Sequence, residues 1–197
     1  MSTFDPKPIV LEGQTVNLIP MLPEHAEALM QVGNHPSIWQ YLPVKYPETL
    51  EDYQAFIVEA KQREQDLGDV AFVVYHKEED RIVGTTRYLD VQKHHRGLEI
   101  GWTWLGTDYW RTVVNTECKF LLFSHAFDDL GAIRVQLKTD SRNNRSQKAI
   151  ERIGAKREGT LRNHYIMPDG YQRSTVMFSI TQKDWKEVKP QLKLRLL

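Results

Sequence analysis

The sequence predicts a mixed α+β fold in a single domain over residues 1–197. Three neighbouring strand signals joined by short charged turns indicate an antiparallel sheet. A strand–helix–strand unit follows them, and an antiparallel start continued by such a unit makes a mixed sheet with helices on both faces. No internal repeat, low-complexity tract or Gly/Ser linker interrupts the chain. No domain boundary is therefore expected.

The first half of the chain carries six predicted elements. In the first of them Val16 and Leu18 alternate with Thr15 and Asn17, which is typical of a half-buried strand. The next two segments place apolar residues at helical spacing, and three apolar runs bounded by charged turns follow. The expected elements are a strand over Thr15–Ile19, helices over Pro23–Val32 and Glu48–Arg63, and strands over Val70–Tyr75, Ile82–Leu89 and Leu98–Leu105.

The second half predicts two helices and three strands. Asn115–Phe127 carries apolar residues around most of its circumference, which indicates a largely buried helix. Arg134–Thr139 alternates as a strand, and Asn143–Ile153 is a helix that ends at Gly154. Two final strands flank the turn at residues 168–170.

The composition argues against several classes of protein. Lys and Arg total 26, as do Asp and Glu, so the formal net charge is zero. A dedicated nucleic-acid binder would depend on a large basic excess. The longest apolar run, Val70–Tyr75, is far shorter than the roughly 18 residues of a membrane span, and Met1–Lys7 lacks the apolar region of a secretory signal. Cys118 is the one cysteine, so no intrachain disulfide forms and a cytoplasmic location is expected.

Charge is unevenly distributed along the chain. Residues 134–173 hold ten basic and four acidic side chains, whereas residues 1–69 hold four basic and eleven acidic ones. Such a basic stretch suits either a solvated helix face or a polyanionic ligand.

A polar turn joins the strand Leu98–Leu105 to the buried helix. A helix N-terminus binds anions because its first amides are unpaired and its dipole end is positive. Arg111 would add a forked donor for phosphate oxygens. The alternative is an ordinary helix start, in which Asn115 or Thr116 caps the helix and Glu117 meets its dipole.

A second polar segment, Asp140–Ser146, opens the later helix. Its side chains could hydrogen-bond an extended ligand, and Arg142, Arg145 and Lys148 could meet phosphates. The alternative is again capping, with Asn143 as the N-cap and the arginines solvated. Neither segment decides the function by itself.

Together with the strands before them, these segments resemble the GNAT superfamily of acetyl-CoA-dependent N-acyltransferases, and within it the ribosomal-protein N-terminal acetyltransferase branch. The resemblance runs from about Leu11 to Ile180, nearly the whole chain. The matching stretches are Val10–Gly13, Ile82–Thr85, Glu99–Trp102, the loop from Tyr109–Trp110 to Thr116–Glu117, and Asn143-x-x-Ser146 leading to Gly154 and Glu158–Gly159-x-Leu161–Arg162.

The loop departs from the family pattern. The family's pyrophosphate loop usually reads Q/R-x-x-G-x-G/A, and Trp110, Val113 and Asn115 stand at its three defined positions. Glycine lets the backbone approach a phosphate closely, so Val113 predicts an altered loop or weaker coenzyme binding. Binding is still expected, because the amides of residues 111–116 remain available whatever their side chains.

The resemblance implies a GNAT-like fold, in which a mostly antiparallel sheet contains a splayed parallel strand pair. Acetyl-CoA would lie in the V-shaped opening between Leu98–Leu105 and Arg134–Thr139, with its pantetheine arm paired to the first strand. An amide near Leu105 would stabilise the thioester oxyanion. The residues expected to bind the coenzyme are Thr103, Trp104, Leu105, Trp110, Arg111, Thr112, Val113, Val114, Asn115, Thr116, Asn143 and Ser146.

The family's chemistry is direct attack of a neutral amine on the thioester, which requires a base for the amine proton. Ser146 matches the family serine near the sulfur and is expected to protonate or hydrogen-bond the leaving thiolate. The carboxylate of the ribosomal branch falls on Tyr165, a poor base at neutral pH. Glu99 and His164 are the alternative bases, acting directly or through water.

The acceptor is expected to be a small amine or a protein N-terminus. Trp39, Tyr41 and Tyr46 would line its pocket or, alternatively, cover the core. The acidic residues of 1–69 would suit a cationic acceptor, although a solvated face explains them equally well. A coenzyme-A-binding module without turnover is the competing function.

Other partners are not expected. Neither His94 and His95 nor Cys118 stands at a metal-ligand spacing. A nucleic-acid binder using residues 134–173 would show salt-dependent binding, but the neutral total charge disfavours it. We expect no membrane partner. A homo-oligomer is compatible with this branch of the family.

Overall fold

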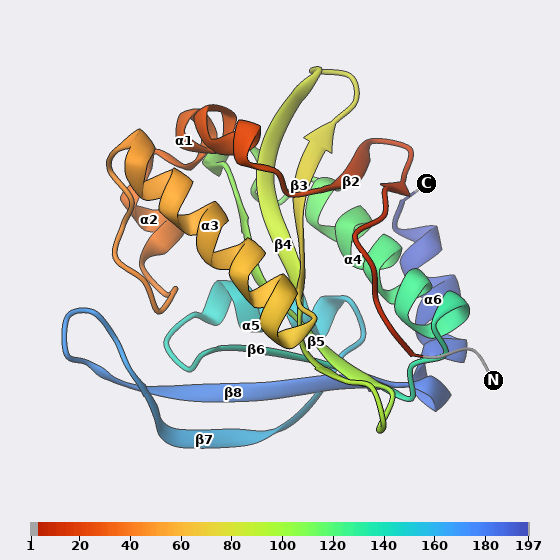
Figure 1. Cartoon of the computed structure of the whole chain (residues 1–197). Coiled ribbons are helices and arrows are strands. Elements are labelled where there is room, and N and C mark those ends of the chain that lie inside the picture. Colours follow the sequence, from red (N-terminus) through yellow and green to blue (C-terminus); the bar gives the residue numbers. More distant parts are fainter. Residues whose placement is uncertain (1–3, 197) are drawn as a thin grey trace.

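One mixed sheet runs through the computed structural model, which describes residues 4–196 (Figure 1). Its strands follow the order β1-β2-β3-β4-β5-β6-β8-β7. They are β1 (Leu11–Glu12), β2 (Val16–Pro20), β3 (Val70–His76), β4 (Arg81–Gln92), β5 (Gly97–Leu105), β6 (Arg134–Asp140), β7 (Lys156–Ile166) and β8 (Gln172–Thr181). All described pairs are antiparallel except β5 with β6. The predicted mixed sheet is thus confirmed.

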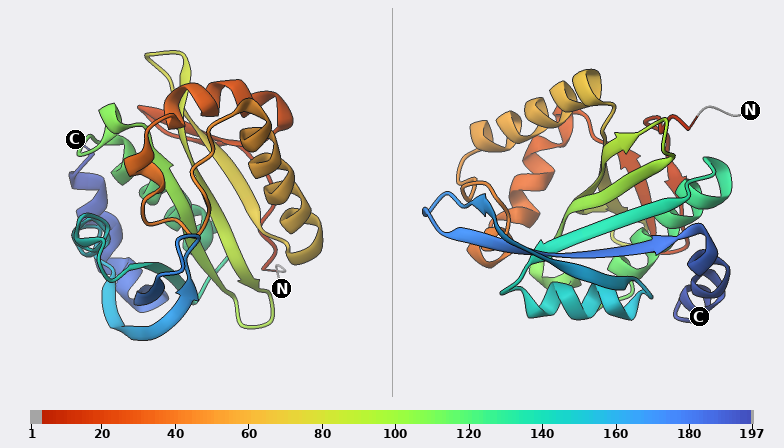
Figure 2. Two further views of the ribbon diagram at one scale, coloured as in Figure 1. Left: turned by 90° about the vertical axis from the view of Figure 1, so that its left-hand side faces the viewer. Right: turned by 90° about the horizontal axis from the view of Figure 1, so that it is seen from below.

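Helices cover both faces of the sheet, as predicted (Figure 2). On one face lie α1 (Ala26–Gly33), α2 (Pro36–Trp39) and α3 (Leu50–Leu67), and on the other lie α4 (Val114–Ser124), α5 (Asn144–Arg152) and α6 (Gln182–Leu194). Two 3-10 turns, η1 (Pro23–His25) and η2 (Thr107–Tyr109), precede α1 and α4, and a π turn, η3 (His125–Asp129), follows α4.

The parallel pair divides the sheet into two halves. β5 and β6 pair over three positions, from Gly97 with Arg134 to Glu99 with Gln136. Beyond that point β5 continues to Leu105 along β4, while β6 continues along β8, and no further pairing joins β5 to β6 within residues 4–196. The two strands therefore splay apart after Glu99.

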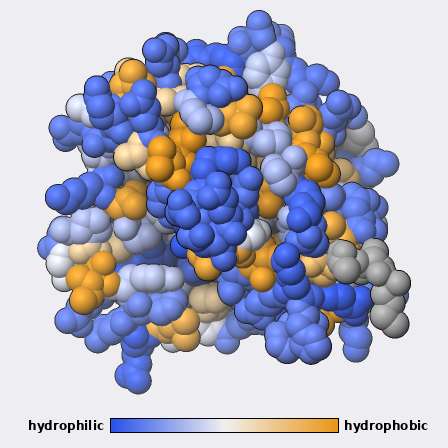
Figure 3. Space-filling view, in the orientation of Figure 1, coloured by the Kyte–Doolittle hydropathy of each residue, from blue (hydrophilic) through white to orange (hydrophobic). Residues whose placement is uncertain are grey.

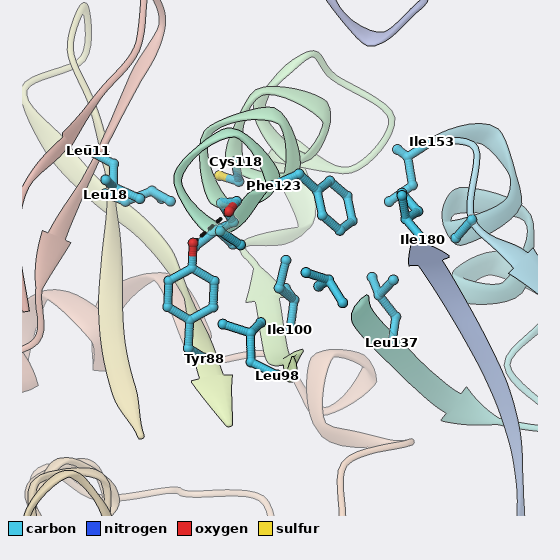
Figure 4. Packing of buried hydrophobic residues seen from close by; sticks show 14 of the residues in the cluster. Leu11, Leu18, Tyr88, Leu98, Ile100, Cys118, Phe123, Leu137, Ile153 and Ile180 are labelled. Atoms are coloured by element: carbon cyan, nitrogen blue, oxygen red, sulfur yellow. Dashed lines mark hydrogen bonds between the residues drawn. The ribbon is translucent and has the colours of Figure 1, made fainter. Parts of the chain in front are cut away.

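Two hydrophobic cores hold the helices against the sheet. In the larger one, Cys118 and Phe123 of α4 face Leu98 and Ile100 of β5 and Leu137 of β6 (Figure 4). The smaller core packs α1, α2 and α3 against the opposite face, where Trp39 meets Tyr53 and Trp104 edge-on or tilted. Because β5 contributes to both cores, its two faces look into two separate compartments.

The visible face of the molecule mixes polar and apolar residues (Figure 3). Hydrophilic and hydrophobic residues are interspersed on the face drawn in Figure 1 (Figure 3). Within residues 4–196, none of the helices combines the length and the apolar character that crossing a membrane requires.

The structure adds three elements that the periodicity did not predict: β1, α2 and α6. The first two are short, with two and four residues. α6 had a detectable signal, because Thr181 and Asp184 form a capping box and Trp185, Val188 and Leu192 follow at helical spacing. The prediction that the chain ends in two strands was therefore wrong.

Candidate active site

The helix start of α4 lies at the open end of the splayed strands, where the sequence predicted an anion site. The N-cap position is Val113, and no side chain caps it. The alternative of a cap by Asn115 or Thr116 is therefore wrong, since both residues lie inside the helix. The amides at this end keep the unpaired donors of an uncapped helix.

Glu117 lies in the first turn of α4, as the alternative required, and its carboxylate is bound by a neighbouring turn. Its carboxylate accepts hydrogen bonds from the amides of Gln14, Thr15 and Val16, at 2.6, 2.9 and 2.9 Å. The side chain is buried and ties the helix to the turn between β1 and β2.

Most amides of the loop have no acceptor. Between residues 111 and 116, the Val114 amide alone donates to an acceptor in the described part of the chain, the Thr112 hydroxyl at 3.3 Å. Arg111 adopts a left-handed backbone with φ of 65°. Val113, at the family's glycine position, has φ of −67° and ψ of −23°. The loop conformation thus requires no glycine at Val113, and the left-handed residue is Arg111 instead.

The two predicted coenzyme segments touch across the mouth of the V. The Arg145 guanidinium at the start of α5 lies 3.4 Å from the centroid of the Trp110 ring. The Trp110 indole N–H donates to the carbonyl of Leu105 at 3.0 Å. A cation therefore stacks on Trp110, the residue at the Gln or Arg position of the family pattern.

The opening of α5 is capped as the alternative predicted. The Asn143 side-chain oxygen accepts from the Ser146 amide at 3.0 Å. This hydrogen bond uses the side-chain oxygen of Asn143. The side-chain amide group of Asn143 and the Ser146 hydroxyl have no hydrogen-bond partner within residues 4–196. Capping and ligand binding are therefore compatible here.

A lysine that the sequence analysis missed lies behind the predicted coenzyme strand. Lys119, on α4, is buried, and its Nζ donates to the Thr103 hydroxyl at 2.6 Å. Thr103 also hydrogen-bonds Thr86 at 2.8 Å. Burial lowers the pKa of Lys119 to about 8. No carboxylate pairs with this ammonium among the described residues.

The other two strand residues predicted to bind the coenzyme, Trp104 and Leu105, could contact a ligand between β5 and β6 only through their backbone. Trp104 and Leu105 are buried, with Trp104 in the smaller core. A bulge precedes them, because β4 pairs Arg87 with Gly101 and then Thr85 with Trp104, which leaves an extra residue on β5. Their side chains are thus unavailable to a ligand, and only their main chain could bind one.

Two predicted catalytic residues come together through a third that the sequence did not indicate. Glu99 is 2% exposed, and its Oε2 lies 3.0 Å from the Nζ of Lys138. The same Nζ donates to the Tyr165 hydroxyl at 3.1 Å. Burial raises the pKa of Glu99, and the charge of Lys138 opposes this shift. The register of β5, β6, β8 and β7 places these side chains in one cluster.

His164 lies at the edge of this cluster. It is exposed, with its ring 4.2 Å from that of Tyr165, and residues 160–164 together with Ser174 line a cavity of about 770 Å³. Partial burial and then the charges of Lys138 and Arg173 lower its pKa. His164 is therefore in reach of the cluster but outside its buried part.

The aromatic residues between the first two helices separate into two groups. Trp39 is buried in the smaller core, and its indole donates to the Gly33 carbonyl at 2.9 Å. Tyr46 hydrogen-bonds Asn34. Tyr41 borders the polar cluster, since its carbonyl accepts from Arg173 at 3.2 Å. Only Tyr41 of the three contacts the cluster.

No group of three or more His, Cys, Asp or Glu side chains within residues 4–196 is arranged to hold a metal ion. The features that fit an anionic coenzyme are the open amides of residues 111–116, the uncapped start of α4 and the edge of β5 left unpaired beyond Glu99. An extended ligand carrying phosphates satisfies all three.

Comparisons with known proteins agree with this geometry. The profile of the family described as Acetyltransferase (GNAT) domain matches residues 15–156. The uncharacterized N-acetyltransferase YoaA of Bacillus subtilis strain 168 is 22% identical over 173 residues, which cover 88% of this chain and 97% of YoaA.

Solved structures share the fold. A protein from T. thermophilus described as an acetyltransferase is 34% identical, with a TM-score of 0.87 over 98% of this chain and 99% of that one. A GCN5-related N-acetyltransferase from Brucella melitensis is 25% identical, with a TM-score of 0.92 over 98% and 87%. Structures of ribosomal-protein acetyltransferases from Vibrio share the fold at 17–20% identity. The matched profile, the identity and the splayed β5–β6 pair together show that this chain belongs to the GNAT family of acetyltransferases.

Proposed function

We propose that the chain transfers an acetyl group from acetyl-CoA to a primary amine. The observation that carries this proposal is the pairing of two chemically distinct sites at one split in the sheet. Unpaired amides at the start of α4 suit the coenzyme's diphosphate, and the buried Glu99–Lys138 pair lies at the last β5–β6 pairing position.

The coenzyme would be held by backbone more than by side chains. The amides of residues 111–116 would bind the diphosphate, and the unpaired edge of β5 would bind the pantetheine arm as an added strand. Arg145, stacked on Trp110, would add a charge-assisted donor at the mouth. When bound, acetyl-CoA supplies an activated thioester carbonyl.

Glu99 is the proposed base. At pH 7 a primary amine of pKa near 10 is protonated about 10³-fold over its neutral form, so its proton must leave before attack. The raised pKa of the buried Glu99 makes its carboxylate a better proton acceptor than an exposed one. Lys138 holds that carboxylate in place through an ion pair. Its ammonium also donates to the Tyr165 hydroxyl, so a line of polar groups runs from Glu99 to Tyr165.

The leaving thiolate takes a proton from an acid on the other side of the split. Ser146 keeps the role that the resemblance implies, because its hydroxyl has no recorded partner in the described chain and α5 begins at the mouth of the V. The Tyr165 hydroxyl is the alternative donor. Hydroxyl groups of serine and tyrosine both act as O–H donors, so either residue can supply the proton.

A thiol-release assay with a panel of amines tests the function. Release of coenzyme A in proportion to acetylated amine, confirmed by mass spectrometry, is the expected result. Calorimetric binding of acetyl-CoA without release for any amine would instead favour a coenzyme-A-binding module. We expect the activity in the cytoplasm, on a small amine or a protein N-terminus.

A further inference from the structure

Arg173 is a buried cation that lacks a carboxylate partner. It lies on β8, is 5% exposed and forms no ion pair within residues 4–196. Its Nη1 donates to the carbonyl of Tyr41, while its Nε has no hydrogen-bond partner there. A buried guanidinium with an unused donor costs free energy unless an acceptor completes it. The Arg173 guanidinium thus keeps a donor without an acceptor among the described residues.

The carboxylates nearest to Arg173 are already bound by other cations. Asp140 accepts from Arg142 through both of its oxygens, at 3.1 and 2.8 Å, and Glu99 accepts from Lys138. Each of these two carboxylates is thus paired with a cation other than Arg173. Burial lowers the pKa of Arg173, while the charges of Asp140 and Glu99 raise it only in part.

Two side chains, Tyr165 and Lys138, connect Arg173 to the proposed base Glu99. The Tyr165 ring centroid lies 5.5 Å from the Arg173 guanidinium carbon and 5.5 Å from the Lys138 ammonium. Lys138 in turn contacts Glu99. Arg173 and the Glu99–Lys138 pair are therefore joined through the Tyr165 ring.

The local charge also selects against other acceptors. The positive charges of Lys138 and Arg173 act on His164, whose pKa falls after burial through their repulsion. A polyamine would bring a second ammonium into the same positive region and be repelled. An amine that carries a carboxylate would instead neutralise it.

We propose that Arg173 binds a carboxylate of the acceptor, and that the acceptor is therefore an amino acid-like amine rather than a polycation. The proposal rests on the proposed acetyl transfer and names its substrate class. Either a free amino acid or a peptide whose first residue is Asp or Glu carries this chemistry. It differs from the cationic acceptor that the acidic residues of 1–69 suggested.

Binding distinguishes the classes without requiring turnover. The complex with coenzyme A is titrated calorimetrically with L-amino acids, their carboxamides and their decarboxylated amines, and with dipeptides that begin with glutamate or glutamine. We expect at least one acid to bind about 10- to 100-fold more tightly than its carboxamide, as for a charge-assisted pair. If free amino acids bind more tightly than the peptides, the acceptor is a free amino acid. If the peptides bind more tightly, it is a peptide N-terminus.

Variants assign the effect to this residue. Arg173→Gln is expected to remove the difference in affinity between an acid and its carboxamide. Arg173→Lys is expected to keep part of this difference because the charge remains. Arg157→Gln removes an exposed arginine from the same hairpin and should leave the difference in affinity unchanged. If Arg173→Gln does not fold, the wild-type comparison and Arg173→Lys still decide.

Equal binding of acids and carboxamides, tighter binding of polyamines, or no binding of any acid at millimolar concentration would overturn the proposal. The failure of acetyl transfer is separate, because it appears as the absence of released thiol with every amine. Acids that bind through Arg173 without turnover would reject the transfer function and keep the carboxylate site.

Discussion

The carboxylate of Glu99 lies 3.0 Å from the ammonium of Lys138, at the point where β5 and β6 stop pairing. Glu99 is 2% exposed and Lys138 is partly buried, so the pair is shielded from the screening that weakens surface ion pairs. The β5–β6 register therefore both positions Glu99, the proposed base, and sets the point at which the two strands separate.

Replacing Glu99 by Gln should lower kcat about 10²- to 10⁴-fold, the usual loss for a general base. Coenzyme affinity should stay within about twofold, because the amides of residues 111–116 are untouched. Steady-state rates measure kcat, and calorimetry measures the coenzyme affinity. Glu187→Gln, the same substitution at an exposed glutamate of α6, is the matched control. Equal rates for wild type and Glu99→Gln would remove Glu99 as the base.

The pH profile reports the same carboxylate. A base acts in its ionised form, and burial raises the pKa of Glu99. The rate kcat/KM should therefore fall on the acid side at a pH higher than an ordinary glutamate would give, and this limb should vanish in Glu99→Gln. An acid limb that persists in the variant would assign the titration to another group, such as His164.

Changing Val113 to Asp should weaken coenzyme binding while stabilising the protein. An aspartate at the N-cap of α4 satisfies an open amide and meets the positive end of the dipole, which typically adds about 1 kcal/mol. The same charge repels a diphosphate, so Kd should rise about tenfold or more. Val113→Asn, a neutral cap, separates the two effects. Unchanged affinity in Val113→Asp would place the diphosphate elsewhere.

Lys119 should make the protein more stable at higher pH. Its folded pKa of about 8 lies below its ordinary 10.5, so the folded state binds fewer protons between these values and stability rises with pH there. The shift corresponds to a cost on the order of 3 kcal/mol at pH 7. Lys119→Met should therefore match or exceed wild-type stability at pH 7, with the advantage shrinking by pH 10.

Urea denaturation at both pH values measures this effect, with Lys183→Met, an exposed lysine of α6, as the control. Because Lys119 hydrogen-bonds Thr103 of β5, Lys119→Met also tests whether this contact matters for the strand that is proposed to bind the coenzyme. A difference that does not change with pH would mean that Lys119 keeps its ordinary pKa.

Replacing Glu117 by Gln should destabilise the fold by about 1–3 kcal/mol, because one of the carboxylate oxygens that serve three backbone amides becomes a donor. Glu151→Gln, on the exposed face of α5, should change little. The midpoints of urea denaturation compare the stability of the two variants with that of the wild type. A loss no larger than that of Glu151→Gln would show that the contact with the β1–β2 turn is not stabilising.

Local patterns were sufficient for most elements. Alternation and helical spacing depend on neighbouring residues, so β2 to β8 and α1, α3, α4 and α5 lie close to their predicted ranges. α6 was missed although the capping box at Thr181 and Asp184 is local too. Asn143 was correctly predicted as an N-cap, because its partner is three residues away.

The sequence by itself therefore determined most of the secondary structure, the mixed sheet and, through five ordered motifs, the family. The tertiary structure alone decided which side chains meet. Lys138 reaches Glu99 and Tyr165 only through the strand order β5-β6-β8-β7, and Glu117 finds its amides about a hundred residues away. Burial, which raises the pKa of Glu99 and leaves a donor of Arg173 without an acceptor among the described residues, arises from packing between distant segments, and no local pattern encodes it.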